Sequence, residues 1–128
     1  MLKQKIFKPT ESELEILTVL WKHESATVRT VHEELSKTKE AGYTTTLKLM
    51  QIMHEKGLVT RDTGNKTHIY TPAVSKEKTQ TRIVNKMILN LFGGSPTDLV
   101  MQALGGNKTS DEDLQRIERL IVSLKEKK

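Results

Sequence analysis

Residues 42–72 read GYTTTLKLMQIMHEKGLVTRDTGNKTHIYTP, and the order of patterns in this stretch decides the fold. The first part predicts a helix that ends at Gly57, because glycine readily takes the left-handed conformation found just beyond a helix end. Residues 58–61 and 67–71 alternate between apolar and polar types, as strands do. Between them, the Gly64-Asn65 pair favours a hairpin because both residues tolerate a positive φ. The stretch therefore predicts a helix that runs straight into a two-stranded hairpin.

The predicted helix has two unlike faces. With about 3.6 residues per turn, its core side is expected to consist of Tyr43, Thr46, Leu47, Leu49, Met50, Met53 and His54. The other side carries Thr44, Thr45, Lys48, Gln51 and Glu55. A solvated helix face is usually rich in Glu, Lys and Arg, so two threonines beside a lysine and a glutamine indicate close approach to a polar partner. The base edges in a DNA groove are such a partner.

Two shorter helices are predicted before this one. Residues 10–13 read TESE, which is a capping box, and the apolar positions that follow are Leu14, Leu17, Val19, Leu20 and Trp21. A second helix begins near Thr27, with Val28, Val31 and Leu35 at helical spacing, and it fades in the charged residues 37–40. Three helices followed by a hairpin form a winged helix-turn-helix.

Beyond Pro72 the pattern is purely helical. Ser75 can cap a helix that ends at Gly93-Gly94 and whose apolar positions are Ile83, Val84, Met87, Ile88, Leu91 and Phe92. A short helix should open at Ser95-Pro96 and end at Gly105-Gly106, and a last helix should begin near Ser110. We therefore predict a mainly α protein, with a winged-helix domain over residues 1–73 and a three-helix dimerisation domain over residues 74–128.

The three C-terminal helices are too short to bury both of their faces by themselves. They could pack against the N-terminal half or pair with a second copy of the chain. We favour a homodimer, because a winged helix is already a closed unit and the reading of DNA half-sites suits two-fold symmetry. The expected dimer core consists of Ile88, Leu91, Ile117, Leu120, Ile121 and Leu124.

Composition narrows the class of protein further. The formal net charge of +5 and the pI near 9.5 favour a polyanionic partner. The chain has no cysteine, which excludes disulfides, thiolate catalysis and thiolate metal sites. No apolar run approaches the ~18 residues of a membrane span, and residues 1–5 do not resemble a signal peptide. We expect a cytoplasmic protein without membrane insertion.

An enzyme would have to depend on one of the four histidines. None of them has a partner at metal-ligand spacing, and no nucleophile or carboxylate pair accompanies them. The Gly93-Gly94 and Gly105-Gly106 pairs lack the spacing of a phosphate-binding loop and are better explained as helix stops. We therefore expect no catalytic residue, no metal and no cofactor.

The layout resembles the BlaI/MecI/CopY family of bacterial penicillinase-type repressors over nearly the whole chain. The resemblance is carried by TESEL at 10–14, Trp21, ATVRTV at 26–31, YTTTL at 43–47, KGLVTR at 56–61, YTP at 70–72 and FGGS at 92–95. It implies an N-terminal winged-helix domain that binds double-stranded operator DNA and a C-terminal helical domain that forms a homodimer. Repression would follow from occupation of a palindromic operator.

The resemblance and the chemistry of the side chains suggest the same DNA contacts. The family's major-groove contacts would fall on Thr44, Thr45 and Lys48, and Gln51 lies on the same face. A threonine hydroxyl can bond to a base edge or a phosphate, and a lysine can reach a guanine edge. The hairpin residues Arg61 and Lys66 would support the contact through the DNA backbone. The alternative for Thr44 and Thr45 is that they only cap the helix.

The chain also departs from the family pattern. Ile52 occupies a position where family members often carry a basic or polar residue, and it points away from the predicted core. Inducible members are cut by a membrane sensor protease at an Asn-Phe bond, whereas the matching residues here are Gln102-Ala103. A regulatory protease is thus a possible partner, but with another specificity, or the inducing signal is unrelated to β-lactams. The rival function is a winged helix that docks proteins without specific DNA binding.

Overall fold

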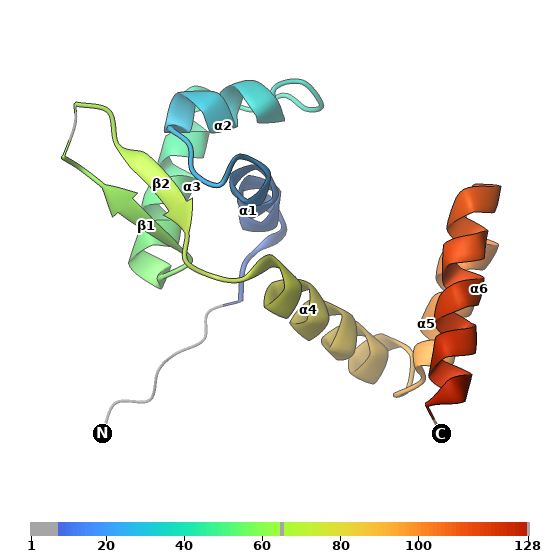
Figure 1. Cartoon of the computed structure of the whole chain (residues 1–128). Helices are drawn as coiled ribbons and strands as arrows, with labels where there is room; N and C mark the ends of the chain where they lie inside the picture. The colour runs from blue at the N-terminus through green and yellow to red at the C-terminus, as the bar shows by residue number, and fades with distance from the viewer. Residues whose placement is uncertain (1–7, 65, 128) are drawn as a thin grey trace, which may run out of the picture. The chain divides into compact units, whose positions relative to one another are not determined.

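The computed structural model describes residues 8–64 and 66–127. Its elements are α1 (Glu11–His23), α2 (Val28–Leu35), α3 (Tyr43–Lys56), β1 (Val59–Asp62), β2 (Ile69–Pro72), α4 (Lys76–Leu91), α5 (Pro96–Gly105) and α6 (Asp111–Glu126) (Figure 1). The mainly α prediction is confirmed, with a winged helix followed by three further helices. The chain divides into one unit that ends at Thr81 and a second that begins at Arg82.

Local sequence signals begin and end the helices of the first unit. Thr10 and Glu13 form the predicted capping box at the start of α1, and the Thr27 hydroxyl accepts a hydrogen bond from Thr30 at the start of α2. Gly57 ends α3 with a φ of 83°, in the left-handed region that glycine tolerates best. These signals require no distant partner, and the predicted starts of α1, α2 and α3 are confirmed.

The core of the first unit lies between α1, α2, α3 and the hairpin. Its fully buried side chains include Ile16, Leu17, Leu20, Val31, Met50, Met53, Val59 and Tyr70. The two strands are antiparallel, and Arg61 is opposite Tyr70. Tyr70 also exchanges two backbone hydrogen bonds with Ala26, of 2.9 and 2.8 Å. This bridge attaches the hairpin to the segment between α1 and α2, and it could not be predicted from local sequence patterns.

A buried ion pair joins the start of α1 to the end of α3. The Oε1 atom of Glu13 accepts one hydrogen bond from the Thr10 backbone N–H, at 2.9 Å, and another from Lys56 Nζ, at 2.8 Å. Lys56 Nζ also lies 2.9 Å from Glu13 Oε2. The Glu13 side chain is 2% exposed and that of Lys56 is 23% exposed. One carboxylate therefore caps α1 and fixes the last turn of α3.

The structure corrects two details of the sequence analysis. Tyr43, which we placed on the core side, is 46% exposed because it lies in the first turn of α3, at the edge of the core. At the hairpin turn, Gly64 is not among the glycines with positive φ. Its backbone N–H instead donates to Asp62 Oδ1 at 2.9 Å, so a side chain stabilises this turn. Asn65 lies outside the described residues.

The first unit continues beyond residue 73, where we expected the domain boundary. Trp21 Nε1 donates to the carbonyl of Val74 at 3.0 Å, and Thr79 in the first turn of α4 is buried. The start of α4 therefore packs with the winged helix. Whether residue 73 bounds a domain that folds alone stays a prediction.

The second unit contains the rest of α4 together with α5 and α6. Ser95 and Ser110 accept hydrogen bonds from the first turns of α5 and α6. Gly93 and Gly94 end α4 with φ angles of 59° and 86°. Among the described residues of this unit no hydrophobic side chain is buried. Its helices are well defined by their caps, but in a single chain they have no core.

We predict that Lys56→Met destabilises the protein by about 3 kcal/mol, because it leaves the buried Glu13 carboxylate without its cation. Lys39→Met is the matched control. Lys39 pairs with Glu15 at 2.8 Å, but both side chains are about half exposed, so its loss should cost at most ~1 kcal/mol. Urea unfolding followed by the fluorescence of Trp21, the one tryptophan, measures both.

The double variant Glu13→Gln/Lys56→Met should recover part of the loss, because the buried group is then neutral. Equal losses for the two lysine variants would show that the Glu13 pair is no more important than a surface pair.

Candidate nucleic-acid interface

The outer face of α3 is the polar surface that its sequence predicts. Thr46, Met50 and Met53 are buried, and the residues on the opposite side are exposed: Thr44, Thr45, Lys48, Gln51 and Glu55. Leu47, Leu49 and His54 are half-buried at the margins. Because the buried residues recur at helical spacing, the helix cannot rotate about its axis without exposing Met50 and Met53 to solvent. The outer face therefore has a fixed orientation.

The two threonines of this face do not cap the helix. The N-cap of α3 is Gly42, which has no side chain to accept a hydrogen bond. Thr46, one position further along, donates its hydroxyl to the Gly42 carbonyl at 3.2 Å. Among the residues that the structure describes, no partner is found for the hydroxyls of Thr44 and Thr45. Both hydroxyls are thus available to an external partner, which favours the binding interpretation over the capping one.

Ile52 is half-buried but does not belong to the side chains that pack against the core. It lies on the flank of the outer face, between Lys48 and Thr45 on the helical wheel. Its role stays open to experiment.

The two hairpin residues of the predicted site differ in their surroundings. Lys66 is exposed near the tip of the hairpin. Arg61 is half-buried and lies on the same side of β1 as the buried Val59, because side chains alternate along a strand. Its Nε atom is buried, and within residues 8–64 and 66–127 it has no hydrogen-bond partner. The predicted backbone contacts of both residues stay predictions, and Lys66 is the more accessible of the two.

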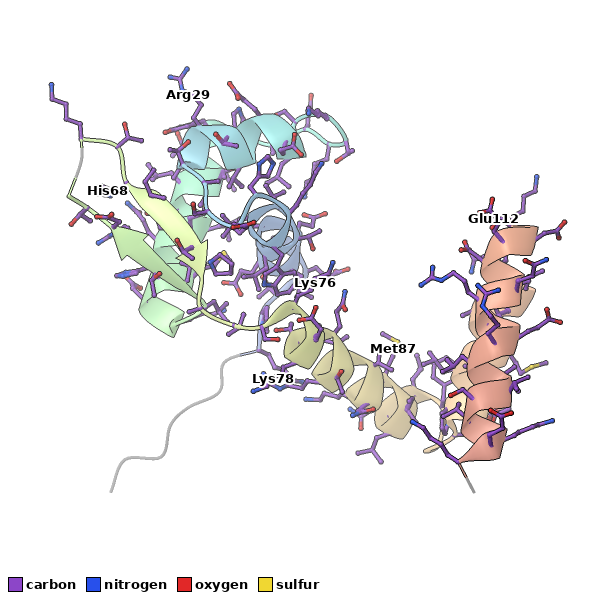
Figure 2. All side chains as sticks on the ribbon, viewed as in Figure 1. Arg29, His68, Lys76, Lys78, Met87 and Glu112 are labelled. Atoms are coloured by element: carbon purple, nitrogen blue, oxygen red, sulfur yellow. The ribbon has the colours of Figure 1, made fainter. Side chains whose placement is uncertain are left out.

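A hollow of about 260 Å³ separates the start of α3 from the hairpin. It is lined by Val28 of α2, Tyr43 and Leu47 of α3, and by Lys66, Thr67 and His68 of the hairpin. Figure 2 shows His68 on the hairpin, and it shows Arg29 pointing outward from α2. Of these residues, only Lys66 was predicted from the sequence to contact DNA. Tyr43 could have been found because its motif begins the helix, but the hairpin residues come near it only through the fold.

Many cations of the first unit are paired with carboxylates. Glu34 of α2 lies 2.6 Å from Lys37 Nζ and 3.6 Å from Lys22 Nζ. The hydrogen bond from Lys37 lowers the pKa of the Glu34 carboxyl below its ordinary value and raises the pKa of the Lys37 ammonium. Lys48 and Lys66, by contrast, form no ion pair with any residue in the described part of the chain. The outer face of α3 and the hairpin therefore offer positive charge that is not neutralised internally.

The residues expected in a dimer core lie on the surface of the single chain. Leu91, Leu120, Ile121 and Leu124 are exposed, and Ile88 and Ile117 are half-buried. Together they contribute much of the apolar surface of α4 and α6. Their part in a dimer stays a prediction.

The described residues were compared with the requirements of a metal site and of a membrane span. Across residues 8–64 and 66–127, no group of three histidine or acidic side chains could hold a metal ion. In the same part of the chain, no helix has both the length and the apolarity needed to cross a membrane.

Comparisons with known proteins agree with this geometry. The model of a family described as penicillinase repressor matches residues 9–123. The chain is 26% identical over 126 residues to the penicillinase repressor of Bacillus licheniformis, and the match covers 98% of each protein.

Two solved structures resemble just over half of the chain. One is the DNA-binding domain of the repressor BlaI, with 28% identity and a TM-score of 0.50, covering 56% of this chain and 90% of that one. The other is the monomeric form of Bacillus licheniformis BlaI in complex with the blaP half-operator, with 30% identity and a TM-score of 0.50, covering 57% and 89%. The family match extends through both units of the structure, and the chain therefore belongs to the penicillinase repressor family.

Proposed function

We propose that this protein is a sequence-specific transcriptional repressor that binds a palindromic operator in double-stranded DNA as a homodimer. The observation that carries the proposal is the outer face of α3, where Thr44, Thr45, Lys48 and Gln51 are exposed while the opposite face is fixed in the core. The similarity to a BlaI structure bound to a half-operator supports it. A member of a repressor family acts by binding, and the chain is not an enzyme.

Each of these four side chains can bind a base edge in the major groove of DNA. The two threonine hydroxyls can donate to or accept from a base edge, and their methyl groups can pack on a thymine methyl. Lys48 can reach the acceptor edge of guanine, and Gln51 can bind adenine through two hydrogen bonds. The exposed Lys66 of the hairpin suits a phosphate of the DNA backbone, which positions the helix without reading sequence.

The second unit supplies the argument for a homodimer. Its apolar side chains are exposed in a single chain, and burial of a leucine is worth about 2 kcal/mol. In a two-fold dimer, the same apolar surface of each copy packs against that of the other, so both are covered. Two copies would then present two α3 helices to two halves of one operator.

Release from DNA would follow from loss of the dimer. Gln102-Ala103, which matches the family's cleavage position, lies inside α5 and is exposed. A cut there would separate α6 from α4 and weaken the dimer, and DNA would dissociate by mass action. A bond within a helix must first unwind before it enters a protease. We propose that a protease of another specificity, or a signal unrelated to β-lactams, releases this repressor.

Titration with duplex DNA tests the proposal against a protein-docking role. A duplex selected from a random library should bind more tightly than an unselected one. Lys48→Ala should weaken binding to the selected duplex by about 1–3 kcal/mol and affect random DNA less, because the lysine reads a base.

Lys66→Ala should weaken both duplexes alike and reduce the slope of log affinity against log salt by about one. If Lys48→Ala lost the same affinity for both duplexes, Lys48 would contact the DNA backbone and not a base. If no duplex were preferred, the docking role would replace the proposal.

Leu120→Asp should convert the dimer into monomers, because it places an unpaired carboxylate in the apolar interface. Sedimentation at about 10 µM measures this, since a sub-micromolar dimer stays associated at that concentration. Val122→Asp is the matched control, because Val122 lies on the same helix, away from the apolar stripe, and is 54% exposed against 58% for Leu120. A monomeric wild type, or a Leu120→Asp variant that stays dimeric, would contradict the assignment.

Exposure of the native host to a β-lactam should produce no fragment that ends at Gln102. Ala103 is small, whereas the resemblance to the family implies a large aromatic residue after the cleaved bond. Mass spectrometry of the protein recovered before and after exposure measures the fragments. A cut between Gln102 and Ala103 that appears only after exposure would show that the family's induction mechanism operates here.

A further inference from the structure

The hollow between the start of α3 and the hairpin has a composition that differs from that of the base-reading face beside it. Its walls offer hydrogen-bond donors and a cation from Tyr43, Lys66 and His68, over an apolar floor of Val28 and Leu47. No carboxylate is among the described residues that line it. Its volume of about 260 Å³ is several times the ~30 Å³ share of one liquid water molecule. The hollow is therefore suited to a small, singly charged anion with an apolar side.

We infer that this hollow seats one phosphodiester group of the bound DNA, held by the Tyr43 hydroxyl and the Lys66 ammonium. The inference rests on the proposed function and assigns a DNA contact to a hollow that the outer face of α3 does not include. A phosphodiester carries one negative charge next to an apolar deoxyribose. The phosphate charge suits the donors of Tyr43, Lys66 and His68, and the apolar sugar suits Val28 and Leu47.

The position of the hollow agrees with this ligand. With α3 in the major groove and the hairpin on the flanking backbone, as proposed above, the DNA strand that borders the groove would pass between that helix and the hairpin. The hollow lies between these two elements, with Tyr43 on one side and Lys66 on the other. One phosphate can then bond to both elements and fix their positions along the duplex.

The Tyr43 ring is held in place before DNA binds. It contacts the ring of His32 edge to face, with 5.6 Å between centroids and an angle of 81° between planes. Its hydroxyl has no hydrogen-bond partner among the described residues, and neither has the Lys66 ammonium. A donor whose ring is already oriented loses little conformational entropy on binding.

Tyr43 is thus a positioning residue for its neighbours. Thr44 and Thr45 follow it directly in the first turn of α3, so a phosphate fixed at Tyr43 determines which base edges they meet. Tyr43→Phe removes one hydroxyl and keeps the ring contact with His32. It should weaken binding to selected and random duplexes alike, by about tenfold. The salt slope should not change, because the phenol carries no charge, whereas Lys66→Ala changes it by about one.

Neutral phosphate replacement tests whether the two residues share a ligand. In a set of selected duplexes, each phosphate in turn is replaced by an uncharged methylphosphonate, and affinities are measured by fluorescence anisotropy. For the wild type, replacement at the seated phosphate should cost about tenfold or more. For both Tyr43→Phe and Lys66→Ala that cost should become smaller at the same single phosphate, because each variant has already lost one of its two contacts. Lys48→Ala, on the outer face of α3, should keep the full cost there.

The outcomes separate this inference from the proposed function. If the wild type prefers a selected duplex but Tyr43→Phe binds as tightly as the wild type, only the inference fails. It also fails if Tyr43→Phe and Lys66→Ala reduce the cost at different phosphates. If the wild type binds no duplex, the proposed function fails and the inference with it. Thermal unfolding followed by circular dichroism verifies that each variant is folded.

Discussion

The structure depends on one constraint on α3. One side of this helix must pack in the core while the opposite side stays exposed. Thr46, Met50 and Met53 are buried on one side of a helix of 14 residues, and this leaves the polar side no freedom to turn. The ion pair between Glu13 and Lys56 fixes the far end of the helix. The hydrogen bond from Thr46 to Gly42 closes its first turn. A surface held this firmly can bind a rigid duplex without first becoming ordered.

The second unit is governed by a different constraint. Its helices have complete serine caps, but none of its described hydrophobic side chains is buried, so the free energy that would hold the helices together has to come from another surface. In the proposed homodimer, a second copy of the chain would provide that surface and also a second α3. In this account dimer formation and operator binding are coupled, and loss of one weakens the other through mass action.

Features that depend on neighbouring residues could be predicted from the sequence. The capping box at Thr10, the left-handed Gly57 and the two faces of α3 all follow from spacing within a few residues. Contacts between distant segments could not be predicted. Lys56 is 43 residues from Glu13 in the sequence. The two backbone hydrogen bonds between Ala26 and Tyr70 depend on where the hairpin packs. The hollow beside Tyr43 was missed for the same reason, because the residues that line it come from α2, α3 and the hairpin.

The central claim is that two copies of α3 read the two halves of one operator. Hydroxyl-radical footprinting of the full chain on a duplex selected from a random library tests it most directly. The account predicts two protected patches related by two-fold symmetry, with centres separated by about 10 base pairs or a small multiple of that number. A single unsymmetrical patch, or uniform protection along the duplex, would contradict it.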